Sequence, residues 1–313
     1  MILVSRDLCR STGPLGPSRH EPVMVEEILQ SLQPERGGCF VDATVGGGGH
    51  SLRLLEASPQ VRLLAVDRDA DALERARDRL AAHADRVEFV HAPFSSLDNF
   101  VPEAWRGNVS GIIADFGVSS DQLEDYDRGF SFLNDGPLDM RMDSRTQKTS
   151  AAVLLARASE DELEGWLREY GEERFARRIA HMLVEARRHG PLLRTSQLAE
   201  LVARGVPRGR HSIHPATRTF QALRIVVNRE LDEIEAFLRQ APRLLAADGR
   251  LATLSFHSLE ERRAKQAMRN EVRSGQFEEL VRGGQEPSAA EVRRNPRARS
   301  ARLRVLRRKG ADA

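Results

Sequence analysis

The sequence has little cysteine and lacks any long apolar run. Its two cysteines, Cys9 and Cys39, are too few for a disulfide framework or a cysteine-based metal cluster. A helix that crosses a bilayer needs about 18 or more apolar residues, whereas the opening Met-Ile-Leu-Val is soon followed by Arg6 and Asp7. These absences argue against secretion or membrane insertion and predict a cytoplasmic protein.

Acidic residues are scarce in one long segment. The net charge of the chain is only +2, but residues 174–229 hold twelve arginines against two acidic residues, Glu185 and Glu200. A second basic run occupies residues 293–309. Phosphate binding would account for both runs. The alternative is that both are solvated helix faces, in a chain that uses arginine almost everywhere in place of lysine.

Strands alternate with helices in much of the chain. Apolar runs of strand length occupy residues 39–42, 61–66, 87–90, 111–114 and 250–256. The helical patterns between them predict βαβ units, and therefore an α/β fold with a doubly wound, mostly parallel sheet. A long helical pattern from Ser150 interrupts this alternation, and a single amphipathic helix is predicted at residues 220–238.

The length of 313 residues leaves room for one large domain and an appendage. Residues 1–18 combine glycine and proline with polar neighbours, and we expect them to be a disordered leader. We expect residues 19–125 and 215–313 to form the sheet domain, with a basic C-terminal tail from about residue 291. Residues 126–214 are then an inserted helical domain.

The first predicted strand runs into four consecutive glycines, Gly46 to Gly49. Glycine in such a turn allows a backbone to approach a ligand closely. The turn is not the G-x-G-x-x-G dinucleotide motif, and no lysine follows it as in a phosphate-binding loop. Asp67 ends the second strand, where a carboxylate can accept hydrogen bonds from the ribose hydroxyls of a nucleoside. Taken alone, Asp67 could instead cap the following helix.

Asp115 ends the fourth predicted strand. The carboxyl ends of parallel strands line the ligand crevice of an open α/β sheet, so Asp115 should face the reactive end of a bound cofactor. The loop that follows, residues 116–122, carries several hydrogen-bonding groups. It is suited to hold cofactor and substrate, although a simple turn is the alternative.

Longer motifs occur along the chain in a fixed order. They are His20 with residues 22–24, then residues 42–50, 115–122, 128–132, 136–143, 170–176, 214–222, 255–260 and 295–300. In content and order they resemble the RsmH family, also called MraW, over nearly all of residues 20–306. The departures are mild: Asp121 stands where many relatives have proline, and Val45 precedes the unbroken glycine run.

The resemblance implies a class I methyltransferase with an inserted RNA-recognition domain and S-adenosyl-L-methionine as cofactor. The implied reaction is methylation at N4 of a cytidine in the decoding region of 16S ribosomal RNA, in the small subunit or its precursor. The cofactor contacts carried over by resemblance are Gly48, Gly49, His50, Asp67, Phe94, Asp115 and Gln122. Phe94 would lie beside the adenine. The oligomeric state is left open, a dimer included.

The implied chemistry assigns roles to a few more residues. The N4 amine of cytosine is a poor nucleophile, so it needs a hydrogen-bond acceptor, for which Asp115 is the first candidate and His257 the second. Methyl transfer from a sulfonium requires no metal. A base in structured RNA must be unstacked to reach such a site, and Phe116, Phe130 and Phe132 are candidates to receive it.

Two other classes of function compete with methyl transfer. A nicotinamide-dependent dehydrogenase uses the same kind of sheet, but the dinucleotide motif is missing. A non-enzymatic RNA-binding module would explain the basic runs, but it does not explain the glycine turn together with Asp67 and Asp115. A binding titration that compares S-adenosylmethionine with NAD separates all three.

Overall fold

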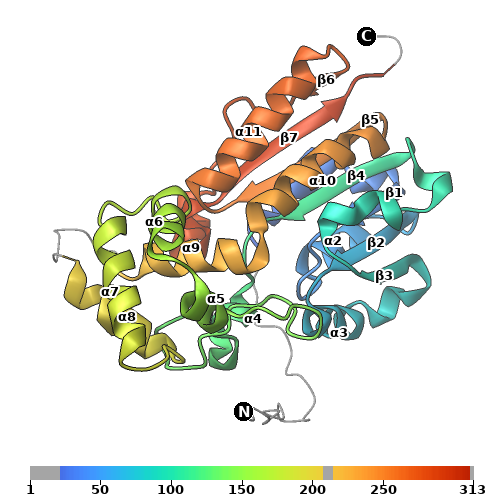
Figure 1. Cartoon of the computed structure of the whole chain (residues 1–313). Coiled ribbons are helices and arrows are strands. Elements are labelled where there is room, and N and C mark those ends of the chain that lie inside the picture. The colour runs from blue at the N-terminus through green and yellow to red at the C-terminus, as the bar shows by residue number, and fades with distance from the viewer. Residues whose placement is uncertain (1–21, 207–213, 311–313) are drawn as a thin grey trace.

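The computed structural model describes residues 22–206 and 214–310, and its centre is a seven-stranded sheet (Figure 1). The strands are β1 (Gly38–Asp42), β2 (Val61–Asp67), β3 (Val87–His91), β4 (Val109–Asp115), β5 (Leu245–Ser255), β6 (Phe277–Glu279) and β7 (Arg302–Arg308). Their order is β3-β2-β1-β4-β5-β7-β6. The pairs from β3 to β5 are parallel, and β7 is antiparallel to β5 and β6. The predicted α/β fold with a mostly parallel sheet is confirmed.

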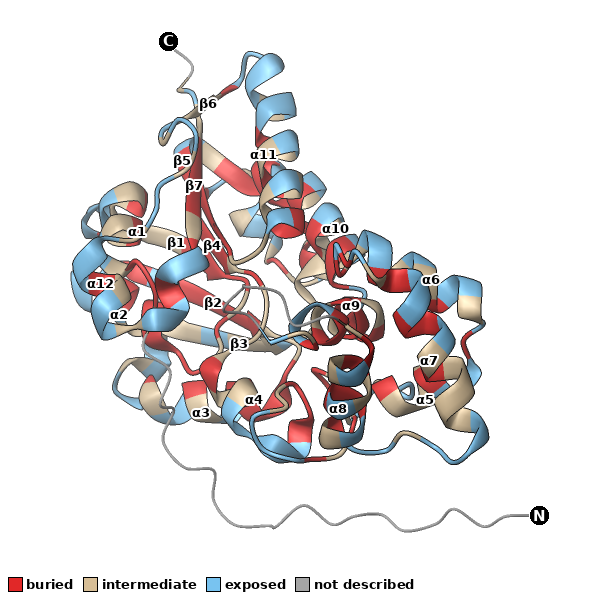
Figure 2. Cartoon of the chain, turned by 90° about the vertical axis from the view of Figure 1, so that its left-hand side faces the viewer, coloured by how far each residue is buried: buried red, intermediate tan, exposed pale blue. Residues whose placement is uncertain are grey.

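Helices cover both faces of this sheet. The α-helices are α1 (Val25–Leu32), α2 (Gly49–Ala57), α3 (Ala70–Arg79), α4 (Ser120–Glu124), α5 (Ala151–Arg157), α6 (Glu160–Glu169), α7 (Ala176–Arg188), α8 (Thr195–Gly205), α9 (Thr217–Asn228), α10 (Glu230–Leu244), α11 (Ser258–Arg273) and α12 (Ala289–Arg294). Val41 packs in a core with α10 and α11, whereas its neighbour Phe40 packs in a second core with α1, α2 and α3. This alternation buries the central strands β1, β2, β4 and β5 on both faces (Figure 2).

A third core belongs to the helices α5 to α9, which gather on one side of the sheet (Figure 1). Leu163 and Leu167 of α6 pack there with Ile179 and Leu183 of α7. Helix α9 contributes Phe220 to the same core, although the sequence places it in the sheet domain. We therefore propose that the inserted domain ends at the junction of α9 and α10 rather than at residue 214.

The prediction of a single helix at residues 220–238 is wrong, because the chain forms two helices that meet at Arg229. Arg229 has left-handed backbone angles, φ 52° and ψ 37°, which end α9. The side chain of Asn228 donates to the Met140 carbonyl at 2.7 Å and accepts from the Met142 N–H at 2.8 Å. These bonds fix the junction against the segment that enters the inserted domain.

The C-terminal basic run is not a free tail. Residues 302–308 form strand β7 inside the sheet, and Arg304 is 2% exposed. Arg304 donates to Glu261 at 2.7 Å and also pairs with Glu279, while Arg307 pairs with Glu278. Acidic partners from α11 and β6 therefore neutralise Arg304 and Arg307 of this strand, which is neither a helix face nor an unstructured tail.

Strand β5 begins at Leu245, earlier than the predicted apolar run at residues 250–256. Asp248, with φ 61°, lies in a bulge inside this strand. The leader at residues 1–18, His20 of the first motif, and Arg208 and Arg210 of the basic run lie outside the described residues. Among the described helices, none combines the length and apolarity that a membrane span requires.

Candidate functional site

Three neighbouring strands each end in an aspartate: β1 in Asp42, β2 in Asp67 and β4 in Asp115. Parallel strands bring their carboxyl ends to one edge of the sheet, and the strand order reverses between β1 and β4. The structure thus brings Asp67 and Asp115 to the same edge, as predicted from their strand-end positions. Asp42 is not among the site residues predicted from the sequence. Its position at the end of a strand, like that of Asp67 and Asp115, could have identified it.

The glycine turn joins these strands through hydrogen bonds. The Gly46 N–H donates to the Asp67 carboxylate at 2.9 Å, and the Asp115 N–H donates to the hydroxyl of Thr44 at 2.7 Å. Gly48 has φ 78°, and a Cβ at Gly49 would lie 2.9 Å from the ring of Pro22. Backbone conformation and packing therefore already require glycine at 48 and 49, apart from any ligand.

The three carboxyl groups lie in surroundings that favour their protonated forms. Burial raises the pKa of Asp42 to about 6, and burial with the nearby charge of Asp69 raises the pKa of Asp67 to about 7. Burial, together with the charges of Asp42 and Glu260, raises the pKa of Asp115 to about 8. In the described part of the chain, no arginine or lysine pairs with any of the three strand-end carboxylates. A ligand that carries positive charge would stabilise the ionised forms of these carboxyl groups.

Three of the predicted cofactor residues have partners within the protein. His50 is buried, with Nε2 at 2.9 Å from the Val23 carbonyl. Gln122 accepts from the Ser119 N–H at 3.0 Å and donates to Asp69 at 2.8 Å. The ring of Phe94 lies among aromatic neighbours, 6.0 Å from that of Phe116 and 5.4 Å from that of Phe237.

The side chains of His50 and Gln122 therefore join separate segments of the chain near the carboxyl ends of the strands. Their polar atoms already bond to protein groups at the edge of the strands. A contact of either residue with a cofactor would use its backbone or remaining hydrogen-bonding capacity.

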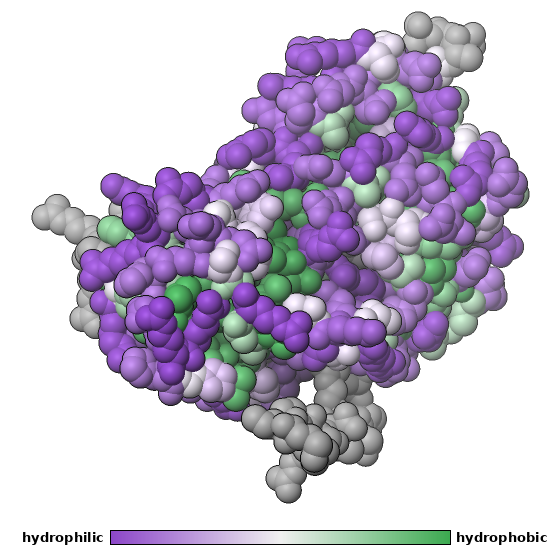
Figure 3. Space-filling view, viewed as in Figure 1, coloured by the Kyte–Doolittle hydropathy of each residue, from purple (hydrophilic) through white to green (hydrophobic). Residues whose placement is uncertain are grey.

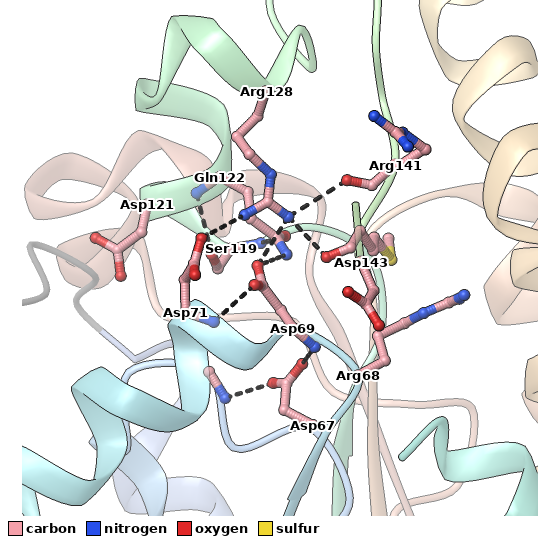
Figure 4. Close-up of polar contacts among 12 residues, drawn as sticks. Asp67, Arg68, Asp69, Asp71, Ser119, Asp121, Gln122, Arg128, Arg141 and Asp143 are labelled. Atoms are coloured by element: carbon pink, nitrogen blue, oxygen red, sulfur yellow. Dashed lines mark hydrogen bonds and ion pairs between the residues drawn. The ribbon is translucent and has the colours of Figure 1, made fainter. Parts of the chain in front are cut away.

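A buried arginine links the turn after β2 to the segment that precedes α5 (Figure 4). Arg128 is 4% exposed and its guanidinium lies 2.9 Å from Asp69 Oδ2 and 3.5 Å from Asp71 Oδ2. It also donates to the Met142 carbonyl at 2.7 Å. Asp69 in turn caps helix α3 by accepting from the Asp71 N–H. The turn after β2 is thereby fixed to the loops that precede α5, a link that the sequence does not reveal.

His257 follows β5 at the same edge of the sheet. Its Nε2 lies 3.1 Å from Glu260 Oε1, and the other oxygen of Glu260 accepts from the Phe256 N–H at 2.7 Å. His257 and then Arg224 oppose the burial of Glu260, and its pKa is lowered. His257, the second candidate acceptor predicted from the sequence, is therefore paired with the buried carboxylate of Glu260.

The surroundings of His257 resemble a metal-ligand cluster in composition. Ligand atoms of Glu230, His257 and Glu260 lie within 4.8 Å of one another. However, the guanidinium of Arg224 donates to both oxygens of Glu230 at 2.9 Å. Arg224 thus supplies the positive charge that these carboxylates need, and we infer a structural ion network here rather than a metal centre.

The aromatic residues predicted to receive a base are mostly in the core. Phe116 is 2% exposed and Phe130 is 6% exposed, so the prediction that they offer a stacking surface is wrong for this structure. Their apolar rings belong to the cores of the sheet and of the inserted domain, respectively. Phe132 is only partly buried, and its ring lies 4.7 Å from that of His214.

The sheet order, with antiparallel β7 between β5 and β6 and a ligand edge at the switch from β1 to β4, defines a class I S-adenosylmethionine-dependent methyltransferase fold. The chain belongs to the MraW methylase family, whose model matches residues 17–309. The family, the fold class and the cofactor expected from the sequence are thereby confirmed.

Curated relatives carry the name ribosomal RNA small subunit methyltransferase H. That of Cyanothece sp. is 49% identical over 92% of this chain and 94% of its own length. Those of Syntrophotalea carbinolica and Thioalkalivibrio sulfidiphilus are 47% and 46% identical, over 93% and 92% of this chain and 98% and 97% of their own lengths. Among solved structures, TrmN from Thermus thermophilus aligns with a TM-score of 0.42 at 16% identity, over 91% of this chain and 48% of that one.

Proposed function

We propose that this methyltransferase transfers a methyl group from S-adenosylmethionine to N4 of a cytidine in the decoding region of 16S ribosomal RNA. The names of the relatives support the RNA of the small ribosomal subunit as substrate. The motif resemblance supports N4 and the decoding region. A cytoplasmic location, where ribosomal subunits are assembled, goes with this substrate.

The observation that carries the proposal is the set of strand-end carboxyl groups at the switch point. Asp42, Asp67 and Asp115 have raised pKa values and no cationic partner in the described chain, which fits a ligand with sulfonium and ammonium charges. When bound, the cofactor supplies an electrophilic methyl group. The proposed binding residues are Gly48, Gly49, His50, Asp67, Phe94, Asp115 and Gln122. Asp67 retains acceptor capacity for ribose hydroxyls beside its bonds from the Gly46 and Asp69 N–H groups.

Asp115 is the proposed catalytic residue. In its ionised form it would accept a hydrogen bond from the N4 amine and stabilise positive charge that develops on that nitrogen. No hydrogen bond to the Asp115 carboxylate occurs within the described residues, so its oxygens are available for this role. His257, which is paired with Glu260 and follows the neighbouring strand β5, is the second candidate acceptor.

The proposal is tested with S-adenosylmethionine and 16S RNA, supplied both as naked RNA and in small subunits from cells that lack this modification. Nucleoside mass spectrometry should find N4-methylcytidine, formed only when the enzyme is present. The Asp115→Asn variant should be about 10²–10⁴-fold slower in single turnover at saturating cofactor. A methyl group on another atom or another base would contradict the proposed acceptor.

A further inference from the structure

A basic depression lies on the inserted domain, away from the strand-end carboxyl groups. It has a volume of about 490 Å³ and is lined by residues of α6, α7 and the link between them. Its cationic lining residues are Arg168, Arg174, Arg177, Arg178 and His181. In Figure 3 the surface over α6 and α7 is mainly hydrophilic.

The lining residues differ in whether their charge is already compensated. Arg168 pairs with Glu164, and His181 lies 3.3 Å from Glu160. By contrast, Arg174, Arg177 and Arg178 are exposed and make no hydrogen bond or ion pair with any described residue. Three guanidinium groups thus share one concave surface, and the carboxylate that also lines it, Glu160, lies beside His181.

Their position at the beginning of α7 makes this arrangement unfavourable for the protein alone. The first turn of a helix carries the positive end of its dipole, where anions are stabilised and cations are not. Arg177 and Arg178 occupy that turn of a 13-residue helix, which has no acidic residue there. Phosphate groups would offset both the dipole and the unpaired guanidinium charges. The half-buried ring of Phe175 adds a flat wall against which a base can stack.

The link between α6 and α7, which helps to form the depression, also contacts helix α11 directly after His257. Glu172, in the link between α6 and α7, accepts from the Ser258 hydroxyl at 2.8 Å and from Arg262 at 3.2 Å. Ser258 directly follows His257 and begins helix α11. A phosphate bound at α7 therefore has a fixed relation to the edge where β4 and β5 end.

We propose that Arg174, Arg177 and Arg178 bind backbone phosphates of the part of the substrate RNA that lies against helices α6 and α7. This rests on the proposed function for the identity of the RNA. Within the basic run at residues 174–229, it assigns phosphate binding to one depression rather than to the run as a whole.

The test compares two triple variants with equal loss of charge. The first is Arg174→Gln, Arg177→Gln and Arg178→Gln, and the matched control is Arg239→Gln, Arg243→Gln and Arg269→Gln. The control arginines are also exposed and also lack partners among the described residues, but they lie on α10 and α11 outside the depression. Binding of 16S RNA is measured over a series of salt concentrations.

The depression variant should bind RNA at least about tenfold more weakly at about 0.15 M salt, and its slope of log affinity against log salt should fall by about 2, because each phosphate contact contributes roughly 0.7 in single-stranded RNA. The KM for RNA should rise, while S-adenosylmethionine affinity and the rate at saturating RNA should remain those of wild type. The control should keep the wild-type slope.

Equal slopes for the two triple variants would overturn the phosphate site, whether or not the RNA is methylated. A reduced slope in the depression variant, combined with no methylation by the wild-type enzyme, would retain the phosphate site and refute the proposed function instead. Thermal unfolding and cofactor titration of both variants identify any loss of fold.

Discussion

The raised pKa of Asp115 leads to a prediction about cofactor binding. Burial, with the charges of Asp42 and Glu260, raises this pKa to about 8, so most of the free enzyme is protonated at Asp115 at neutral pH. If the carboxylate faces the positive charge of S-adenosylmethionine, binding must release that proton. Cofactor affinity should then increase as the pH rises towards 8 and level off above it.

The size of the effect follows from proton linkage. A single proton released on binding changes the affinity by up to tenfold per pH unit below the pKa of the free enzyme. With a pKa of about 8, affinity should increase by roughly 25-fold between about pH 6.5 and pH 8.5. The Asp115→Asn variant has no such proton, so its affinity should be nearly constant between about pH 7.5 and 8.5.

Isothermal titration calorimetry of both proteins in buffers of different ionisation enthalpy measures this dependence and counts the protons released. The control is Asp67→Asn, which should retain the rise towards pH 8 because Asp115 remains. Parallel pH profiles for wild type and Asp115→Asn would refute the reasoning, since Asp115 would then not be the group whose ionisation is coupled to binding.

The same pKa affects the stability of the free protein. Because the pKa is about 8 in the folded chain against a reference value of 3.8, the folded chain holds a proton that the unfolded chain has released between these values. The contribution of Asp115 to stability therefore decreases as the pH rises through this window. Urea unfolding without cofactor should find Asp115→Asn more stable than wild type at about pH 9, by a few kcal/mol, and similar to it near pH 4.

The other predictions concern buried charges and the ribose edge. Arg128→Ala should lower the free energy of unfolding by about 3–5 kcal/mol, because Asp69 is left buried without its partner; urea denaturation should also find that Asp69→Asn in the same chain restores part of the loss. Arg304→Ala should destabilise the sheet by a comparable amount, about 3–5 kcal/mol, since Arg304 is 2% exposed and paired with Glu261; a wild-type melting temperature would contradict this. Asp67→Ala should weaken S-adenosylmethionine binding by about 1–3 kcal/mol in calorimetry without loss of fold.

Local patterns in the sequence were sufficient for the first half of the sheet. Apolar runs that end in Asp67 and Asp115 predict both the strands and the edge where they meet, because parallel strands have a common direction. The break at Arg229 could not be predicted in this way. A non-glycine residue with positive φ has no sequence marker, and both helices that meet there are amphipathic.

The side-chain partners of the site were also beyond sequence reasoning. Arg128 and Asp69 are far apart in the chain, and only the folded structure brings them together. The same is true of Gln122, whose amide bonds to Asp69. A motif identifies such residues as important, but it does not reveal whether they contact a ligand or connect segments of the protein to one another.

The two basic runs illustrate how the structure separates arginines of similar sequence context. In β7, Arg304 and Arg307 face Glu261 and Glu278, so their charges are compensated inside the protein and contribute to the fold. At the beginning of α7, Arg174, Arg177 and Arg178 have no such partners in the described chain and line a depression. Exposed arginines on a convex surface are solvated by water, so the absence of a partner alone is not informative.

What distinguishes α7 is that unpaired charges of one sign converge on a concave surface at a helix end of the same sign, where each raises the electrostatic cost of the others. The strand-end residues Asp42, Asp67 and Asp115 form the opposite case: their acidic groups converge without a cation, and their pKa values are raised. A protein that binds a cationic cofactor and an anionic RNA needs both kinds of surface. Neutralising either set should therefore impair one ligand and leave the affinity for the other unchanged.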